Sequence, residues 1–391
     1  RRRGRAGRGA EPGPRADGQA AAHRQLRHVR VAARGLERAP GGDGAGPAQR
    51  EPARALVLGR RDLDRLAVER GRELHQFVTV RLESMRDAER AIRDMQVRGA
   101  PLIGVTAAYG VALGLLHDES DSQLKRVIDL LATTRPTAVN LHWALARMQR
   151  VLEKSALAIR CEASTRRVRR ETAWREARAI AAEDVSTNAQ LGDHGLHLLI
   201  EHQRKESVLN VMTHCNAGRL ATVAHGTALA PIYAALAAGI AVHVWVSETR
   251  PRNQGLLTAW ELAEAGVPHT LIADNAAGLL IMQGKVDLII VGADRIAANG
   301  DTANKVGTYL KALAAHAHGV PFYVAAPLST IDFSCPSGHD IPIEERAPTE
   351  LGAGDVPVAN PAFDITPAHL ITGIISERGV VTPEDLAQWK I

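Results

Sequence analysis

The feature that most constrains the fold is an alternation of short apolar runs and helical segments in the second half of the chain. Five runs read as strands, and segments with helical spacing separate them. The strand candidates are VLNVMT (208–213), AVHVWVSE (241–248), PHTLIA (268–273), VDLIIVGA (286–293) and PFYVAAP (321–327). The helix candidates span 220–239, 257–266, 275–284 and 304–319. This pattern predicts parallel βαβ units, and therefore a Rossmann-like, doubly wound α/β domain over residues 206–391.

The sequence before this domain has a different pattern. Residues 77–205 contain successive stretches with helical spacing, among them 86–97, 98–116 and 133–148, where Pro136 is expected in the first helical turn. We predict a mainly helical first domain over 77–205, with a small β-sheet at its start.

The first 76 residues are basic and lack apolar periodicity. They begin RRRGRAGRGA and are rich in Arg, Gly, Ala and Pro, which predicts a partly disordered segment over 1–76. Much of the excess behind the net charge of +5 lies there. The charge therefore does not indicate a nucleic-acid surface on the folded part, and no nucleic-acid partner is expected.

The cysteines and the apolar runs exclude several classes of protein. Cys161, Cys215 and Cys335 are scattered and odd in number, which argues against a disulfide framework, and they lack CxxC zinc spacing. No apolar run has the length of a membrane span, and no signal-peptide pattern opens the sequence. We expect a soluble, cytoplasmic protein without a metal site.

Polar side chains gather where the predicted strands end. Ligands of open parallel sheets bind outside the carboxyl ends of the strands. The polar residues that follow the predicted strands are Thr213, His214, Cys215 and Asn216, then Glu248, Thr249 and Arg250, then Asp274 and Asn275, then Asp294 and Arg295. A binding site is expected at this edge.

Cys215 is placed by the pattern at the hinge between a strand and a helix. At the amino end of a helix, unpaired N–H groups and the helix dipole favour a thiolate, and hence a reactive cysteine. The alternative is a buried cysteine that behaves as a small apolar side chain. Its place in a glycine-containing turn favours the functional interpretation.

Asp294 follows the apolar strand 286–293. A carboxyl group at the end of a dry strand can have a raised pKa and act as a general acid, or it can simply cap a turn. The pattern alone does not separate the two. Asn304 and Lys305 would begin the helix 304–319, where a cation is disfavoured unless an anionic ligand binds there. The alternative for Lys305 is a solvated surface side chain.

Arg98, Gly99, Ala100 and Arg135 precede predicted helices of the first domain. Glycine lets backbone N–H groups approach a ligand closely, and a neighbouring arginine suits a phosphate. Exposed surface positions are the alternative. His214 and His225 do not form a metal-site pattern, and no Walker A or G-x-G-x-x-G fingerprint follows a strand.

Several motifs resemble one family when they are taken together. They are MQVRGAPLIGV, TRPTAVNLHWA, THCNAG, SETRPRNQG, HTLIADN, GADRIAANGDTANKVGTYLKAL and IPIEERAP. In this order they resemble the methylthioribose-1-phosphate isomerases of methionine salvage, from about Arg81 to the segment NPAFDITPAHLITGIISERG.

The resemblance implies an isomerase that converts 5-methylthioribose 1-phosphate to 5-methylthioribulose 1-phosphate, a homodimer without metal or organic cofactor. It places the catalytic cysteine and aspartate of the family on Cys215 and Asp294. It places the substrate-binding positions on Arg98, Gly99, Ala100, Arg135, Gln254, Asn304 and Lys305. Gln254 is implied by the resemblance alone.

Two other protein classes share the fold that the resemblance implies. Ribose-1,5-bisphosphate isomerase would keep the Cys215/Asp294 pair but is expected to have extra basic residues in place of a methylthio site. The regulatory subunits of the translation-initiation exchange factor would not be expected to keep this pair together with the substrate-binding set. They are the less favoured alternative.

Overall fold

The computed structural model describes residues 54–57, 67–70, 80–157, 162–203 and 207–390, all within one compact unit, Arg50–Ile391. Strands β1 (Arg54–Val57) and β2 (Ala67–Arg70) pair antiparallel. A small sheet therefore stands before residue 77, where the sequence predicted the first domain to begin. The disorder predicted for 1–76 otherwise lies outside the described residues, and the division into 77–205 and 206–391 stays a prediction.

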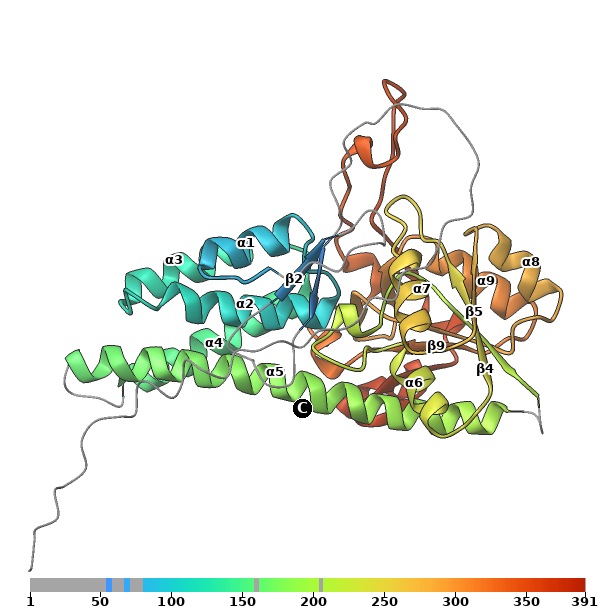
Figure 1. Cartoon of the computed structure of the whole chain (residues 1–391), viewed down its shortest axis with the longest axis horizontal. Helices are drawn as coiled ribbons and strands as arrows, with labels where there is room; N and C mark the ends of the chain where they lie inside the picture. Colours follow the sequence, from blue (N-terminus) through green and yellow to red (C-terminus); the bar gives the residue numbers. More distant parts are fainter. Residues whose placement is uncertain (1–53, 58–66, 71–79, 158–161, 204–206, 391) are drawn as a thin grey trace, which may run out of the picture. The chain divides into compact units, whose positions relative to one another are not determined.

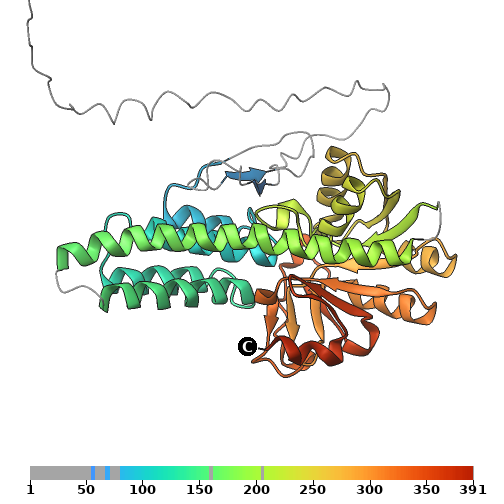
Figure 2. The same ribbon diagram turned by 90° about the horizontal axis from the view of Figure 1, so that it is seen from below.

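A bundle of helices forms the first part of the described chain. Its helices are α1 (Met85–Arg93), α2 (Ala100–Gly114), α3 (Asp121–Ala132), α4 (Val139–Leu157) and α5 (Glu162–His202). Helix α2 is apolar on all sides because α1, α3, α4 and α5 pack around it. Helix α5 continues beyond the bundle and also contacts α6 (Ala230–Ala237) and strand β12 (Gly373–Ser376), as Figure 2 shows.

A seven-stranded sheet forms the centre of the second part (Figure 1). Its strands are β3 (Leu209–Thr213), β4 (Val242–Ser247), β5 (His269–Ile272), β6 (Leu288–Val291), β9 (Phe322–Ala325), β12 and β13 (Gly379–Val381). They lie in the order β13-β12-β9-β6-β3-β4-β5, and every neighbouring pair is parallel except β12 and β13. All four residues of β6 are buried, as expected where helices cover both faces.

Two apolar cores lie on the two faces of this sheet. Leu209 and Val211 point to a core shared with α5, α6 and α7 (Gly255–Glu264), whereas Met212 points to a core shared with α8 (Ala276–Met282) and α9 (Thr308–Ala317). Helices on both faces of a parallel-rich sheet, after a helical first part, confirm the predicted α/β fold. Within the described ranges, no helix combines the length and apolar character that a membrane span requires.

Three predicted helix starts are wrong. The helix predicted over 220–239 is reduced to α6, because His225 and Gly226 adopt positive φ angles of 70° and 80° that interrupt a helix. Asn304 and Lys305 do not begin a helix but end strand β8 (Thr302–Lys305), since Gly307 at φ 101° separates them from α9. Helix α4 begins at Val139, because the residues before it form a turn in which the Ala138 N–H donates to the Arg135 carbonyl at 3.0 Å.

A second sheet, which the sequence did not predict, packs beside the first. Its four strands lie in the order β10-β7-β8-β11, with β7 at Arg295–Ala297, β8 at Thr302–Lys305, β10 at Ile331–Asp332 and β11 at Phe363–Thr366. Short 3-10 turns occur at Arg219–Ala221 (η1), Leu328–Thr330, Gly338–Asp340, Pro348–Glu350, Ala368–Leu370 and Pro383–Trp389.

Candidate active site

The site lies at the switch point of the large sheet. Strands β3 and β6 are parallel neighbours, and the chain leaves them in opposite directions, to β4 on one side and to β9 on the other. Such a reversal opens a crevice at the carboxyl ends of the two strands. Cys215 stands two residues after β3, and Asp294 three residues after β6.

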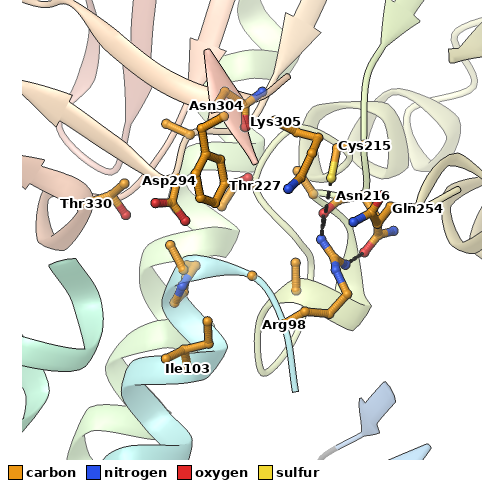
Figure 3. A pocket seen from close by; sticks show the side chains of 18 of the residues that line it. Arg98, Ile103, Cys215, Asn216, Thr227, Gln254, Asp294, Asn304, Lys305 and Thr330 are labelled. Carbon is orange, nitrogen blue, oxygen red and sulfur yellow. Dashed lines mark hydrogen bonds between the residues drawn. The ribbon is translucent and has the colours of Figure 1, made fainter. Parts of the chain in front are cut away.

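One pocket brings together all nine residues predicted from the sequence (Figure 3). Its wall includes Arg98, Gly99, Ala100, Arg135, Cys215, Gln254, Asp294, Asn304 and Lys305. The remaining wall is largely apolar, with Met95, Pro101, Ile103 and Phe363 among its residues. The helical part, the large sheet and the second sheet each contribute to it.

Cys215 lies in a strained turn and not at the start of an α-helix, so that prediction is wrong. Its φ is 66°, in the left-handed region that non-glycine residues rarely adopt. Two threonines hold this turn: the Cys215 N–H donates to Thr249 Oγ1 at 2.8 Å, and Thr258 Oγ1 donates to the Cys215 carbonyl at 2.8 Å. The side chain is 8% exposed, and its sulfur faces the pocket.

Arg98 supplies positive charge beside this sulfur. Its guanidinium lies 3.8 Å from Cys215 Sγ and donates to the Asn216 carbonyl at 2.6 Å and to Asn216 Oδ1 (Figure 3). In place of the dipole of a helix start, which the sequence predicted here, the structure has the positive charge of an arginine beside the sulfur.

Gly99 brings the start of α2 against the loop that follows Cys215. It is the residue before the helix, with φ 88°, and no side chain caps the first turn. A Cβ at this position would lie 2.5 Å from the Cβ and carbonyl oxygen of Ala221, so a side chain does not fit. The unpaired N–H groups of the first turn can bind an anion together with Arg98.

Asp294 and Lys305 line the same pocket. Burial raises the pKa of the Asp294 carboxyl group, while the positive charges of Arg135, Lys305 and Arg295 lower it. Burial lowers the pKa of Lys305, while the nearby Cys215 and Asp294 raise it. Lys305 therefore interacts with both candidate catalytic groups, and its Nζ lies 4.4 Å from the centre of the Phe363 ring.

The other predicted binding residues are buried around these groups. Arg135 is 6% exposed, and one guanidinium nitrogen lies 3.3 Å from Glu344. Gln254 precedes α7, and its buried Oε1 has no hydrogen-bond partner among the described residues. Asn304 donates to Thr308 Oγ1 at 3.0 Å.

Residue-based reasoning missed Glu344 and Phe363. The only signals for them were the motifs IPIEERAP and NPAFDIT, which carry part of the family resemblance. His214 is buried beside the site, with its Nε2 2.9 Å from the Val306 carbonyl. Burial and the Lys311 charge lower the pKa of His214 to about 3, so it is neutral near pH 7. Across the described ranges, no three His, Cys, Asp or Glu side chains gather in a way that could hold a metal ion.

Comparisons with known proteins identify the class to which this fold and pocket belong. Residues 96–383 match the Initiation factor 2 subunit family. The methylthioribose-1-phosphate isomerase of Dechloromonas aromatica is 60% identical over 325 residues, which cover 78% of this chain and 87% of that protein. The Escherichia coli O45:K1 enzyme of the same name is 53% identical, with 78% and 85% covered.

Solved structures give the same result. A crystal structure of 5-methylthioribose 1-phosphate isomerase from Pyrococcus horikoshii OT3 is 40% identical, with a TM-score of 0.72 and coverage of 86% of this chain and 94% of that one. The translation initiation factor eIF-2B subunit delta from A. fulgidus is 38% identical, with a TM-score of 0.69 and coverage of 85% and 97%. The chain therefore belongs to the Initiation factor 2 subunit family and, within it, to the methylthioribose-1-phosphate isomerases. The family predicted from the motifs is confirmed.

Proposed function

We propose that this chain is an aldose–ketose isomerase that converts 5-methylthioribose 1-phosphate to 5-methylthioribulose 1-phosphate in methionine salvage. The observation that carries the proposal is the identity of 60% with a methylthioribose-1-phosphate isomerase over most of both chains. The pocket at the switch point supports it, because a thiol and a carboxyl group face it from two adjacent strand ends.

The phosphate of the substrate would bind on the side of the pocket where positively charged side chains lie next to backbone N–H groups that have no partner in the helix. Arg98 and the uncapped start of α2, at Gly99 and Ala100, form one side of the pocket. Arg135 and Lys305 add two further cations, and Gln254 and Asn304 offer amide groups to the sugar hydroxyls. Charge-assisted hydrogen bonds and helix N-termini are the usual means by which proteins hold a phosphate.

Asp294 is proposed as the acid that opens the sugar ring. A phosphate at C1 prevents spontaneous ring opening, so the ring oxygen must receive a proton as the ring bond breaks. A carboxyl group whose pKa is raised by burial remains protonated at a higher pH than an exposed one, and can donate that proton.

Cys215 is proposed to carry or assist the transfer of hydrogen from C2 to C1. The Arg98 guanidinium, 3.8 Å from the sulfur, places a positive charge beside it. Lys305 interacts with both Cys215 and Asp294, and so can stabilise negative charge that develops on the substrate between them.

A second pocket next to the site bears on the choice between a methylthio group and a second phosphate. Arg135, Gln254 and Lys305 line both pockets, but the two further arginines of the second pocket are already paired. Arg252 lies 2.9 Å from Glu350, and Arg346 lies 2.7 Å from the same carboxylate. Arg135 is paired with Glu344 in the same way, so the assay on both sugar phosphates has to separate a methylthio group from a second phosphate at C5.

We also propose a cytoplasmic homodimer with a Rossmann-like catalytic domain. The resemblance of the motifs implies the dimer, and the strand order of the large sheet supports the domain assignment. The test of function is an assay of the purified chain on 5-methylthioribose 1-phosphate and on ribose 1,5-bisphosphate. Turnover of the first sugar is expected, and turnover of the bisphosphate alone would assign the other isomerase activity. If the chain binds neither sugar and turns over neither, the exchange-factor class becomes the better assignment.

A further inference from the structure

One face of α7 holds the turn that carries Cys215. Gln254, Thr258 and Glu261 are spaced four and three residues apart, so they share one side of the helix. All three are buried. Gln254 lines the pocket, Thr258 holds the Cys215 carbonyl, and Glu261 reaches the segment that follows Cys215.

Glu261 accepts four hydrogen bonds, all from neutral groups. Its Oε1 accepts from Asn216 Nδ2 at 2.7 Å and from the Leu220 N–H at 3.1 Å. Its Oε2 accepts from the Arg219 N–H at 2.6 Å and from Tyr233 OH at 3.0 Å. Burial raises the pKa of Glu261, and these bonds oppose that rise. A carboxylate matches the arrangement because it accepts at both oxygens and donates at neither.

The carboxylate fixes which way the Asn216 amide faces. Only the NH2 group of the amide can donate to Glu261, and it also lies 3.1 Å from Thr258 Oγ1. The amide oxygen must then point the other way, where it accepts from Arg98. The same guanidinium lies 3.8 Å from the Cys215 sulfur. A continuous chain of polar contacts therefore runs from Glu261 through Asn216 and Arg98 to the thiol.

We infer that Glu261 is a positioning residue for the reaction: through the Asn216 amide it holds the Arg98 guanidinium beside the Cys215 sulfur. The inference rests on the proposed function for its catalytic meaning, but the geometry it describes can be measured through the chemistry of the thiol alone.

Replacing Glu261 by glutamine would turn one of the two accepting oxygens of this side chain into a donating NH2 group. A carboxamide has one accepting oxygen and one donating NH2 group, so its NH2 group would face either Asn216 and the Leu220 N–H or the Arg219 N–H, all of which donate. Beside Asn216, rotation of the Asn216 amide would remove one conflict, but its NH2 group would then face Arg98, which also only donates. The Arg98 guanidinium would then be held by the Asn216 carbonyl alone, at 2.6 Å, and its position beside the sulfur would loosen. A hydrogen bond to a charged group is worth roughly one to two decades in an equilibrium or a rate.

The test is the rate at which iodoacetamide alkylates Cys215 near pH 7, followed by mass spectrometry of the Cys215 peptide in the full-length chain. Glu261→Gln is expected to slow alkylation about tenfold, and Asn216→Ala by a similar factor. The double variant should be no more than about twofold slower than Asn216→Ala, because the effect of Glu261 passes through that amide. Glu264→Gln is the matched control: it makes the same change on an exposed side chain of the same helix, and should react like the parent.

Three results would overturn the inference. In the first, Glu261→Gln remains folded by circular dichroism and reacts at the parental rate. In the second, the losses of the two single variants multiply in the double variant, which would mean that Glu261 acts on the fold and not through Asn216. In the third, Glu261→Gln does not fold while Asn216→Ala folds and reacts at the parental rate. Because alkylation needs no sugar, a parent that fails to isomerise the substrate would contradict the proposed function without changing this result.

Discussion

Gly99→Ala tests whether the pocket depends on the close packing of Gly99 against Ala221. Gly99 has φ 88°, and an added Cβ would lie 2.5 Å from the Cβ and carbonyl oxygen of Ala221. Carbon atoms in contact normally lie about 3.5–4.0 Å apart, so the start of α2 and the loop at Ala221 must separate by about 1 Å. The change is therefore expected to affect both stability and the geometry of the site.

Two separate costs make up the expected loss of stability. A positive φ costs alanine about 1–2 kcal/mol or more relative to glycine, and overpacking costs about another 1–3 kcal/mol. Gly239→Ala is the matched control, since Gly239 has φ 76° and no atom within 4 Å of an added Cβ. We expect the free energy of unfolding to fall by about 1–2 kcal/mol for Gly239→Ala, and by about 2–5 kcal/mol for Gly99→Ala.

We expect the loss of activity to come from the steric clash at Gly99 and not from the positive φ angle, which Gly99 shares with Gly239. Arg98 and Ala100 flank Gly99, so a shift of about 1 Å displaces the anion site from Cys215 and can cost about a hundredfold in rate. Urea unfolding followed by circular dichroism gives the stabilities, and the isomerase assay gives kcat/KM. Equal losses of stability in the two variants, with parental turnover in Gly99→Ala, would refute the close approach.

Three further predictions concern charge and assembly. Alanine at Arg135 or Lys305 should weaken substrate binding by one to two decades, because a charge-assisted contact is worth roughly 1.5–3 kcal/mol; parental affinity by calorimetry in both variants would mean that the anion site is misplaced. Burial raises the pKa of Asp184 to about 7, so its contribution to stability is complete below about pH 4 and is lost as the pH rises to about 7. The free energy of unfolding of the parent minus that of Asp184→Asn should therefore fall by up to about 1.4 kcal/mol per pH unit in this window, whereas parallel curves would show that Asp184 does not titrate there. Light scattering at micromolar concentration should give the mass of a dimer, and a monomer mass would contradict the proposed assembly.

The sequence predicted five of the seven strands of the large sheet and missed β12 and β13. The central strands were predicted because they are buried on both faces. Strands such as β6, with four buried residues, must then be continuous apolar runs. The second sheet was missed because its pairing is not local. Strand β8 contains Asn304 and Lys305 and pairs with β11, so nothing in its own residues marks it as a strand.

The candidate site could be located from the sequence because ligands of parallel sheets bind at the carboxyl ends of the strands. Cys215 and Asp294 follow adjacent parallel strands, so a rule about sheet edges places them together without knowledge of the loops. The local setting of Cys215 was predicted incorrectly, because small apolar residues after Gly218 favour a helix while left-handed backbone at Cys215 and His225 interrupts one. Glu261 gave no signal at all, since a glutamate within a helix is usually solvated.

The central claim is that Cys215 and Asp294 perform the chemical step on 5-methylthioribose 1-phosphate. The most direct test follows conversion of this sugar by proton NMR for the parent, Cys215→Ala and Asp294→Asn, with sugar-phosphate affinity measured by calorimetry. We expect turnover by the parent and a comparable loss of kcat in both variants, of several decades, with affinity nearly unchanged. Retention of parental kcat per folded molecule by either variant would contradict the assignment of that residue to the chemical step.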